Sequence, residues 1–191
     1  MLKFLAMLMK KQEYIGLETV GTPTISDGVV SDFSSNDYIK INTLNINSAD
    51  IWECVIKIHT SLTNSGQCIF GNNVDWGTNV RINSENQLLC QISNDTTSTD
   101  IGSITGQTVL SDNTDYYVKV KFTGTQYILS LSTNGATWTE EGNVSSTTKI
   151  TDRGIWIFGA YSVAAWYFRG SIDINNSYIK LNNTKYKFIL L

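Results

Sequence analysis

The C-terminal part of the chain contains Trp166-Tyr-Phe-Arg-Gly-Ser-Ile-Asp-Ile-Asn-Asn-Ser-Tyr-Ile-Lys-Leu-Asn182, in which apolar and polar residues alternate, break at Gly170 and alternate again. A period of two places successive side chains on opposite faces of a β-strand. We therefore expect one antiparallel strand to run straight into another at Gly170. The same pattern recurs from about residue 28 to the C-terminus, and it predicts an all-β fold of two antiparallel sheets.

Three other segments carry the same alternation. Residues 52–60 place Trp, Cys, Ile and Ile at even positions, residues 115–122 place Tyr, Val, Val and Phe at even positions, and residues 126–132 place Tyr, Leu and Leu at odd positions. Residues 154–159 are almost continuously apolar, which is typical of a central strand covered on both faces. These segments predict the strands whose apolar faces meet in the core.

Turn residues indicate how neighbouring strands connect. A Ser/Asn/Asp-rich turn separates residues 29–33 from residues 38–41, and we interpret these two runs as a hairpin. Asn134-Gly135 is the strongest short hairpin signal in the chain. Helical periodicity is confined to residues 2–14. The connections are therefore predicted to be β-turns and loops.

The chain of 191 residues fits one large β domain, which we place at residues 15–191. Residues 1–14 are predicted to be an N-terminal extension. Their apolar run is short and no small-residue cleavage site follows it, so we expect no cleaved signal peptide. The extension is interpreted either as an arm that docks on a partner subunit or as a frayed or helical segment.

The composition of the chain limits the classes of partner that it can bind. Charged residues make up 16% of the chain and the formal net charge is −3, so the sequence offers no electrostatic basis for binding a phosphate backbone. Beyond Lys10-Lys11 there is no run of cationic residues. No apolar run approaches the roughly 20 residues that a membrane helix needs. We predict that the partners include neither nucleic acid nor membrane.

The three cysteines, Cys54, Cys68 and Cys90, show no CxxC spacing, so neither a disulfide framework nor a zinc site is predicted. Cys54 and Cys90 share strand parity with apolar residues, which favours buried free thiols. A bridge between Cys54 and Cys90 is the alternative in an oxidising compartment. We predict no metal and no cofactor.

Several of these segments resemble concanavalin A-like lectin and glucanase domains. The residues that carry the resemblance are Trp52–Ile58, Tyr116–Phe122 with Tyr127–Trp138, and Phe168–Ile174 with Tyr178–Leu181. They are similar especially to the laminin-G-like versions found in bacteriophage tail and capsid accessory proteins and in some bacterial surface proteins. The resemblance covers about residues 17 to 185 and implies a jelly-roll sandwich. It says little about function, because that scaffold hosts lectins, glycosidases and assembly modules.

Catalytic residues are not evident. Retaining glycosidases need two carboxyl groups about 5 Å apart, which alternate positions of one strand would supply. Glu140 and Glu141 are adjacent and point to opposite faces, and Asp173 has no acidic partner two residues away. The single His59 faces outward and has no nucleophile at a motif. The sequence therefore predicts a non-catalytic protein, and a glycoside hydrolase with an unrecognised carboxylate pair is the weaker alternative.

A sugar site is predicted in the loop Gly71-Asn-Asn-Val-Asp-Trp-Gly77 and the strand after it. Sugars bind an aromatic platform together with planar amides and charged groups that bond hydroxyls. The loop and strand provide these groups as Asn72, Asn73, Asp75, Trp76 and Arg81. Asn and Asp are also common in loops because they tolerate left-handed backbone, so an ordinary loop with Trp76 over the sheet edge is the alternative.

Three other aromatic residues lie close together in the sequence, before the final strands. Trp166 shares parity with Phe168 and is predicted to lie in the core, whereas Tyr161 and Tyr167 are candidates for an interface or groove.

Taken with the resemblance, these features predict a recognition or decoration module on a larger particle. We expect a phage virion protein of the capsid or tail, with surface carbohydrate as the ligand and other virion subunits as partners of the N-terminal segment. An extracellular or bacterial cell-surface location and a homo-oligomer are compatible with the same features. The alternative is a purely structural assembly protein without a sugar site.

Overall fold

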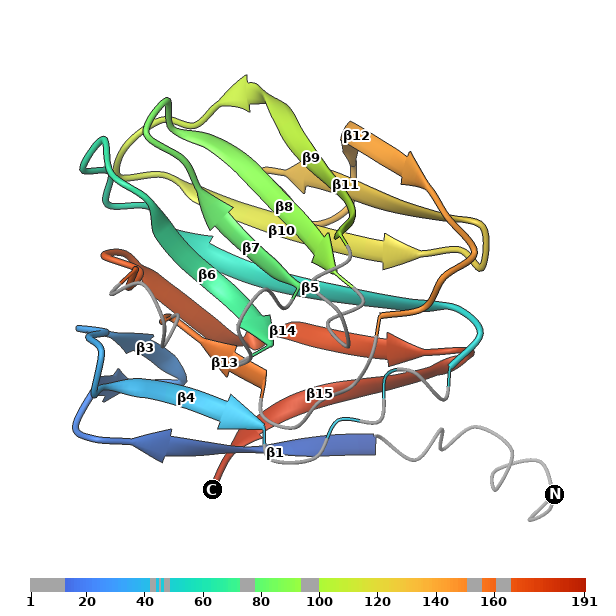
Figure 1. Ribbon diagram of the computed structural model, residues 1–191. Helices are drawn as coiled ribbons and strands as arrows, with labels where there is room; N and C mark the ends of the chain where they lie inside the picture. Colours follow the sequence, from blue (N-terminus) through green and yellow to red (C-terminus); the bar gives the residue numbers. More distant parts are fainter. Residues whose placement is uncertain are drawn as a thin grey trace, which may run out of the picture.

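The computed structural model describes residues 13–41, 44, 46, 49–72, 78–93, 100–150, 156–160 and 166–191 (Figure 1). These residues form fifteen β-strands. In chain order the strands are β1 (Glu13–Val20), β2 (Thr24–Ser26), β3 (Val29–Ser31), β4 (Tyr38–Ile41), β5 (Trp52–His59), β6 (Gln67–Asn72), β7 (Asn79–Ile82), β8 (Gln87–Ser93), β9 (Asp100–Val109), β10 (Asp115–Phe122), β11 (Gln126–Ser132), β12 (Thr139–Ser145), β13 (Trp156–Phe158), β14 (Ser171–Leu181) and β15 (Thr184–Leu190).

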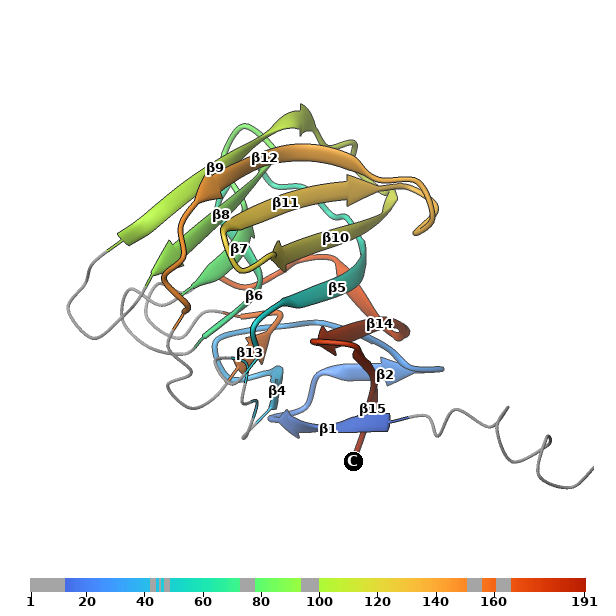
Figure 2. The same cartoon turned by 90° about the vertical axis from the view of Figure 1, so that its right-hand side faces the viewer.

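The strands form two stacked sheets. The first, sheet A, runs in the order β12-β11-β10-β5-β14-β15-β1, and the second, sheet B, runs in the order β1-β4-β13-β6-β7-β8-β9. Figure 1 shows β6–β9 in front with β10 and β11 behind them, and Figure 2 separates the two layers from the side. The expected two-sheet, all-β architecture is therefore confirmed.

The interior lies between the sheets and is lined by the predicted strand faces. On β5, the buried residues Trp52, Cys54, Ile56 and Ile58 alternate with the partly exposed Glu53, Lys57 and His59, apart from Val55, which is buried on the outer face. On β10 and β11, the buried alternate residues are Tyr116, Val118, Val120, Phe122, Tyr127, Leu129 and Leu131. Parity read from the sequence thus placed the core of these strands correctly.

One strand belongs to both sheets. Residues Glu13–Leu17 of β1 pair in parallel with Tyr186–Leu190 of β15, whereas Glu18–Val20 pair antiparallel with β4. At the opposite side of the sandwich, the buried carboxylate of Glu141 on β12 accepts hydrogen bonds from the backbone N–H groups of Gln107 and Thr108 on β9, at 2.7 and 2.8 Å. The two sheets are therefore connected at one edge by β1 and at the other edge by the hydrogen bonds between β12 and β9.

The prediction of a strand pair meeting at Gly170 is wrong. Within the described residues, β14 begins at Ser171, and residues 166–170 are not in a strand. A Cβ at residue 170 would collide with the carbonyl group of His59, so the glycine permits close backbone approach to β5. The partner of β14 in a hairpin is β15, which follows it in the chain.

The predicted hairpin between residues 29–33 and 38–41 is also wrong. β3 pairs with β2 and β14 in sheet A, whereas β4 pairs with β1 and β13 in sheet B. The turn between β2 and β3 is Asp27-Gly28, whose φ angles of 50° and 79° suit the two-residue hairpin turn that needs positive φ at both positions. The chain then changes sheets through a turn in which Ser34 and Asp37 exchange backbone hydrogen bonds.

The three cysteines are buried free thiols, which confirms the interpretation of Cys54 and Cys90 from strand parity. Burial raises the pKa of Cys90 to about 12 and raises that of Cys54 further. Both thiols are therefore protonated and pack as small apolar groups in the core.

The N-terminal extension is shorter than the sequence predicted. Strand β1 includes Glu13 and Tyr14, which the sequence placed in the extension, and residues 1–12 lie outside the described part of the chain.

Candidate functional site

The outer face of β6–β9 carries a group of polar side chains in register. Arg81 on β7 lies opposite Leu89 on β8, and Asn79 lies opposite Gln91. Gln91 in turn lies opposite Ser103 on β9. The intervening residues, Val80, Ile82, Leu88, Cys90 and Ile92, belong to the core. Strand parity therefore places this row on the face away from the core, where Asn79 is itself buried.

A hollow opens between these side chains. Arg81, Leu89, Gln91, Gly102 and Ser103 line a space of about 270 Å³ on the sheet surface. That volume is slightly below the range of small-molecule sites, which starts at about 300 Å³. Its walls combine an apolar surface from Leu89 with a guanidinium, an amide and a hydroxyl, so the site can both donate and accept hydrogen bonds.

An aromatic ring orients the charged residue of this site. The guanidinium carbon of Arg81 lies 4.5 Å from the ring centroid of Trp166, which is partly exposed. The indole also lies close to Gly66, where a Cβ would come within 3.5 Å of it. Within the described residues no carboxylate forms an ion pair with Arg81. Stacking on the ring holds the guanidinium plane while leaving its charge available.

The thiol next to Arg81 on the neighbouring strand is not a nucleophile. Cys68 on β6 lies opposite Arg81 and is buried. Burial raises the pKa of Cys68 to about 12, although the positive charge of Arg81 opposes the shift. A thiol with this pKa is protonated at neutral pH and unreactive.

The predicted sugar-site residues can be placed only in part. Arg81 lies in the site. Asn72 is the last residue of β6 and pairs with Trp156 through the backbone, and its side chain is not described. Asn73, Asp75 and Trp76 lie outside the described residues, so the loop prediction stays a prediction.

Several site residues were missed by sequence reasoning. Gln91 shares parity with Leu89 on β8, which was the available signal. The assignment of Trp166 to the core is wrong, because residues 166–170 are not in a strand and the partly exposed indole stacks on Arg81 instead. Tyr161 lies outside the described residues. Tyr167 is partly buried against the core, with the Arg169 guanidinium 4.6 Å from its ring centroid.

The opposite sheet carries an ion network on its outer face. The Nζ of Lys57 lies 3.1 Å from Asp173 and 3.4 Å from Asp115, and Nδ1 of His59 lies 2.7 Å from Asp115. Asn113 bonds the other nitrogen of His59. The two cations and two carboxylates of this network help to line a shallow hollow of about 230 Å³. His59 is therefore a surface residue, as predicted, and it belongs to a network of alternating charges.

This network has the wrong protonation for glycoside hydrolysis. The hydrogen bond with His59 is the main cause that lowers the pKa of Asp115. For Asp173, burial raises the pKa, but hydrogen bonds from Asn176 and Lys57 outweigh it and the pKa is lowered. Both carboxylates are ionised at neutral pH, so neither can serve as the general acid that such a reaction requires. The pair is held by Lys57 as a structural ion network.

No group of three or more His, Cys, Asp or Glu side chains suited to a metal ion occurs in the described part of the chain. Among the same residues there is no helix of a length and apolarity that would cross a bilayer.

Comparison with known proteins bears on the fold. No family model matches the sequence, and no curated protein matches it. Among solved structures, the CBM40 module of the Ruminococcus gnavus IT-sialidase, bound to α2,3-sialyllactose, superposes with a TM-score of 0.54 at 17% identity, covering 70% of this chain and 76% of that one. Domains LG4-5 of the mouse laminin α1 chain give a TM-score of 0.62 at 12% identity, covering 93% and 47%.

A third similar structure is the enzymatically active domain of tailspike protein 2 from bacteriophage CBA120, with a TM-score of 0.59 at 9% identity, covering 93% of this chain and 30% of that one. The chain thus spans less than half of the laminin and tailspike structures. At these identities the likeness shows the fold alone. This chain has a concanavalin A-like, laminin-G-like fold, which confirms the resemblance seen in the sequence.

Proposed function

We propose that this chain is a non-catalytic recognition module that binds carbohydrate on the outer face of β6–β9 and serves a larger particle. The observation that carries the proposal is the Arg81 guanidinium, which stacks on Trp166 at the edge of a polar hollow. Of the residues named from the sequence, Arg81 belongs to this site. We define the Arg81 site as Arg81, Leu89, Gln91, Ser103 and Trp166.

The chemistry of the Arg81 site suits a sugar. Leu89 offers apolar contact to C–H groups, and Gln91 and Ser103 offer donors and acceptors for hydroxyls. Arg81 offers planar N–H donors that match a carboxylate in a bidentate manner. The sialyllactose bound by the similar Ruminococcus gnavus module supports a glycan ligand. The charge of Arg81 favours an acidic sugar.

Attachment to a larger particle is supported by a separate surface. Tyr14 on β1 and Ile189 on β15 are 56% and 46% exposed and line a hollow of about 530 Å³. Exposed apolar side chains gathered in one place mark protein contacts. This surface includes Tyr14 at the start of β1, the strand that follows the N-terminal segment in the sequence. The similar tailspike domain supports a virion as the particle, and a bacterial or extracellular surface is the other location we consider.

The proposal is tested on a glycan array that includes neutral and acidic oligosaccharides, using the full chain. We expect Arg81→Ala and Trp166→Ala to lower the affinity for the bound glycan at least tenfold, and Arg81→Lys to retain part of it, because lysine keeps the charge but not the planar fork. Arg169→Ala is the matched control, since Arg169 also stacks on an aromatic ring and does not line the hollow. Trp76→Ala tests the predicted loop in the same assay.

Thermal unfolding of each variant accompanies the array. The Arg81 and Trp166 side chains are partly exposed, so their removal should move the midpoint little. Full glycan binding by both Arg81→Ala and Trp166→Ala, or the absence of any bound glycan on the array, would contradict the proposal.

A further inference from the structure

A second polar surface lies on the outer face of sheet A, at the Glu53 end of β5. Backbone register aligns Lys121 on β10, Glu53 on β5, Lys180 on β14 and Lys185 on β15 in one row across the four strands. The next row contains Lys119 on β10 and Lys187 on β15, with Tyr178 between them on β14. We call the five lysines of these rows the lysine face: Lys119, Lys121, Lys180, Lys185 and Lys187.

The strand geometry spaces these ammonium groups over a flat surface. Neighbouring strands lie about 4.8 Å apart, and residues two apart on a strand are separated by about 6.7 Å. The lysine face therefore spans three strand spacings, or roughly 14 Å, from β10 to β15. Such a surface presents several positive charges at regular intervals rather than one focused charge.

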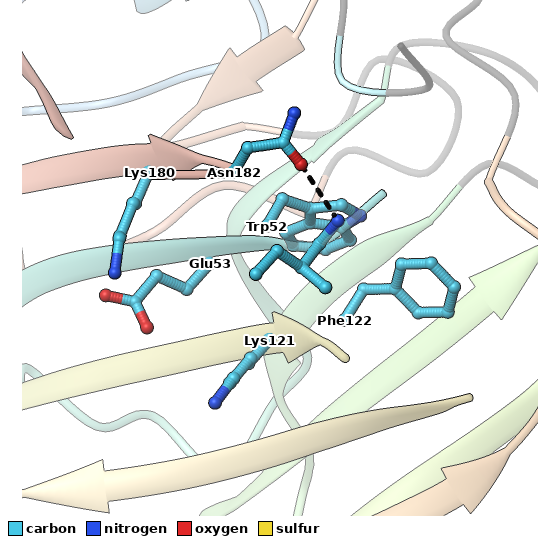
Figure 3. Close-up of a pocket in the computed structure, with 7 residues that line it drawn as sticks. Trp52, Glu53, Lys121, Phe122, Lys180 and Asn182 are labelled. Carbon is cyan, nitrogen blue, oxygen red and sulfur yellow. Dashed lines mark hydrogen bonds between the residues drawn. The ribbon is translucent and has the colours of Figure 1, made fainter. Parts of the chain in front are cut away.

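The lysines have too few acidic partners. In the described structure, Glu53 is the carboxylate within these rows, and Figure 3 shows it flanked by Lys121 and Lys180. The hydroxyl of Tyr178 donates to Glu53 as well, at 3.3 Å. Burial is the main cause that lowers the pKa of Lys185, and the charges of Lys187 and Lys180 lower it further. Like charges placed opposite each other destabilise a sheet, so this arrangement is not explained by stability.

Aromatic rings hold two of the ammonium groups in place. The Nζ of Lys119 lies 3.9 Å from the ring centroid of Trp138, and the Nζ of Lys185 lies 3.6 Å from that of Tyr178. Between the strands, Glu53, Lys121, Lys180 and Asn182 help to line a hollow of about 80 Å³ (Figure 3). Cation–π contacts order otherwise flexible side chains, which lowers the entropy lost when an anion binds.

We propose that the lysine face binds an anionic polysaccharide, a chain of sugars carrying repeated carboxylate or sulfate groups. Several spaced ammonium groups match repeated charges, and the hollow beside Lys121 and Lys180 has room for one small anionic group. Nucleic acid fits less well: the two rings are already covered by lysines and offer little stacking to bases, and a flat sheet enters no groove. The lysine face is separate from the Arg81 site, which lies on the other sheet.

The test uses dextran sulfate and uncharged dextran, the same polymer with and without charges, together with polygalacturonate. We expect the full chain to bind dextran sulfate and polygalacturonate at 0.15 M salt and not dextran. The double variant Lys180→Gln/Lys185→Gln should weaken both interactions at least tenfold and flatten their dependence on salt. The control Lys40→Gln/Lys149→Gln changes the net charge equally but removes lysines paired with Glu18 and Asp50, and it should change binding less than twofold.

Three further measurements sharpen the outcome. The thermal midpoint of Lys180→Gln/Lys185→Gln should stay unchanged or rise, because the repulsion between these lysines is removed. Glu53→Gln should bind dextran sulfate more tightly, because it removes a negative charge from the lysine face. Arg81→Ala should leave dextran sulfate binding intact, which separates this proposal from the Arg81 site. The proposal is overturned if neither anionic polymer binds, if the control pair weakens binding as much as the test pair, or if DNA or polyglutamate binds more tightly than both anionic polysaccharides.

Discussion

The two ends of β5 place cations on the same face of the same sheet and surround them differently. At the His59 end, Lys57 and His59 contact the carboxylates of Asp173 and Asp115 at 2.7 to 3.4 Å. At the Glu53 end, the described structure shows no ion pair to any of the five lysines of the lysine face, and Glu53 is the carboxylate that register places in their rows. The charge of a surface lysine therefore does not by itself show its role. That role depends on which acidic side chains the strand register places beside the lysine.

The paired end also shapes the strand next to it. β14 jumps from Asp173, opposite Lys57, to Tyr178, opposite Val55, so that residues 174–177 bulge out of the ladder. The backbone N–H of Lys57 donates instead to the hydroxyl of Ser177 at 2.9 Å, and that hydroxyl donates to the carbonyl of Asp173 at 2.6 Å. Ions and backbone thus stabilise the same bulge. At the Glu53 end, which we call the unpaired end, the lysines stabilise no comparable bulge in the described structure.

The largest effect should come from the interior that supports both ends. Phe122 is fully buried and stacks on Tyr127 with ring centroids 4.5 Å apart. We expect Phe122→Ala to lower the free energy of unfolding by about 3–5 kcal/mol, because it removes apolar contacts and leaves a cavity. Urea denaturation followed by tryptophan fluorescence measures this. A loss below about 1 kcal/mol would mean that the interior is not packed as described.

The next effect separates the two ends directly. Asp173→Ala removes the acceptor of Lys57 and of the backbone N–H and side-chain amide of Asn176, so we expect a loss of about 1–3 kcal/mol in the same denaturation experiment. Lys185→Ala at the unpaired end should be neutral or slightly stabilising. Equal losses for the two variants would remove the distinction drawn between the ends of β5.

The smallest effect concerns pH. The hydrogen bond to Asp115 is the main cause that raises the pKa of His59 above 6.5, and the same bond lowers the pKa of Asp115 below 3.8. The raised pKa of His59 means that the protonated imidazole stabilises the fold. This stabilisation is lost as the pH rises through the pKa that His59 has in the folded protein. The lowered pKa of Asp115 means that the ionised carboxylate stabilises the fold. This stabilisation is lost as the pH falls through the pKa that Asp115 has in the folded protein.

His59→Gln should therefore reduce stability most between about pH 4 and pH 6.5 and very little above pH 8. Both side chains are well exposed, so solvent screening keeps the difference below about 1 kcal/mol. Unfolding midpoints of the wild type and the variant across this pH range, at low salt, measure the effect. A difference that does not vary with pH would show that the pair does not contribute through its charges.

The sequence predicted strand faces well and strand partners poorly. Alternation in residues 115–122 reports which side of a strand is buried, because that depends only on local spacing. It does not report which strand lies next to it. The lysine face illustrates this limit: its residues come from β10, β14 and β15 and form no run in the sequence, so only the register of the sheet brings them together.

Strands with weak patterns were also missed. β9, Asp100–Val109, contains two glycines and many polar residues, and β15, Thr184–Leu190, carries two lysines on its outer face, so neither shows a marked apolar alternation. In the Arg81 site the same limit applies to Trp166. Its position depends on where β14 begins, and the close approach of Gly170 to β5 is a tertiary feature that local pattern does not contain.

The parallel pairing of β1 with β15 has a mechanical consequence. The chain enters β1 near Glu13 and leaves β15 near Leu190, at opposite ends of a ladder that aligns five residue pairs. Tension applied through these two points would pull the strands lengthwise past each other, so their evenly spaced hydrogen bonds would resist together instead of opening one by one like a zipper. A domain anchored through its ends would in this way withstand traction across the sandwich.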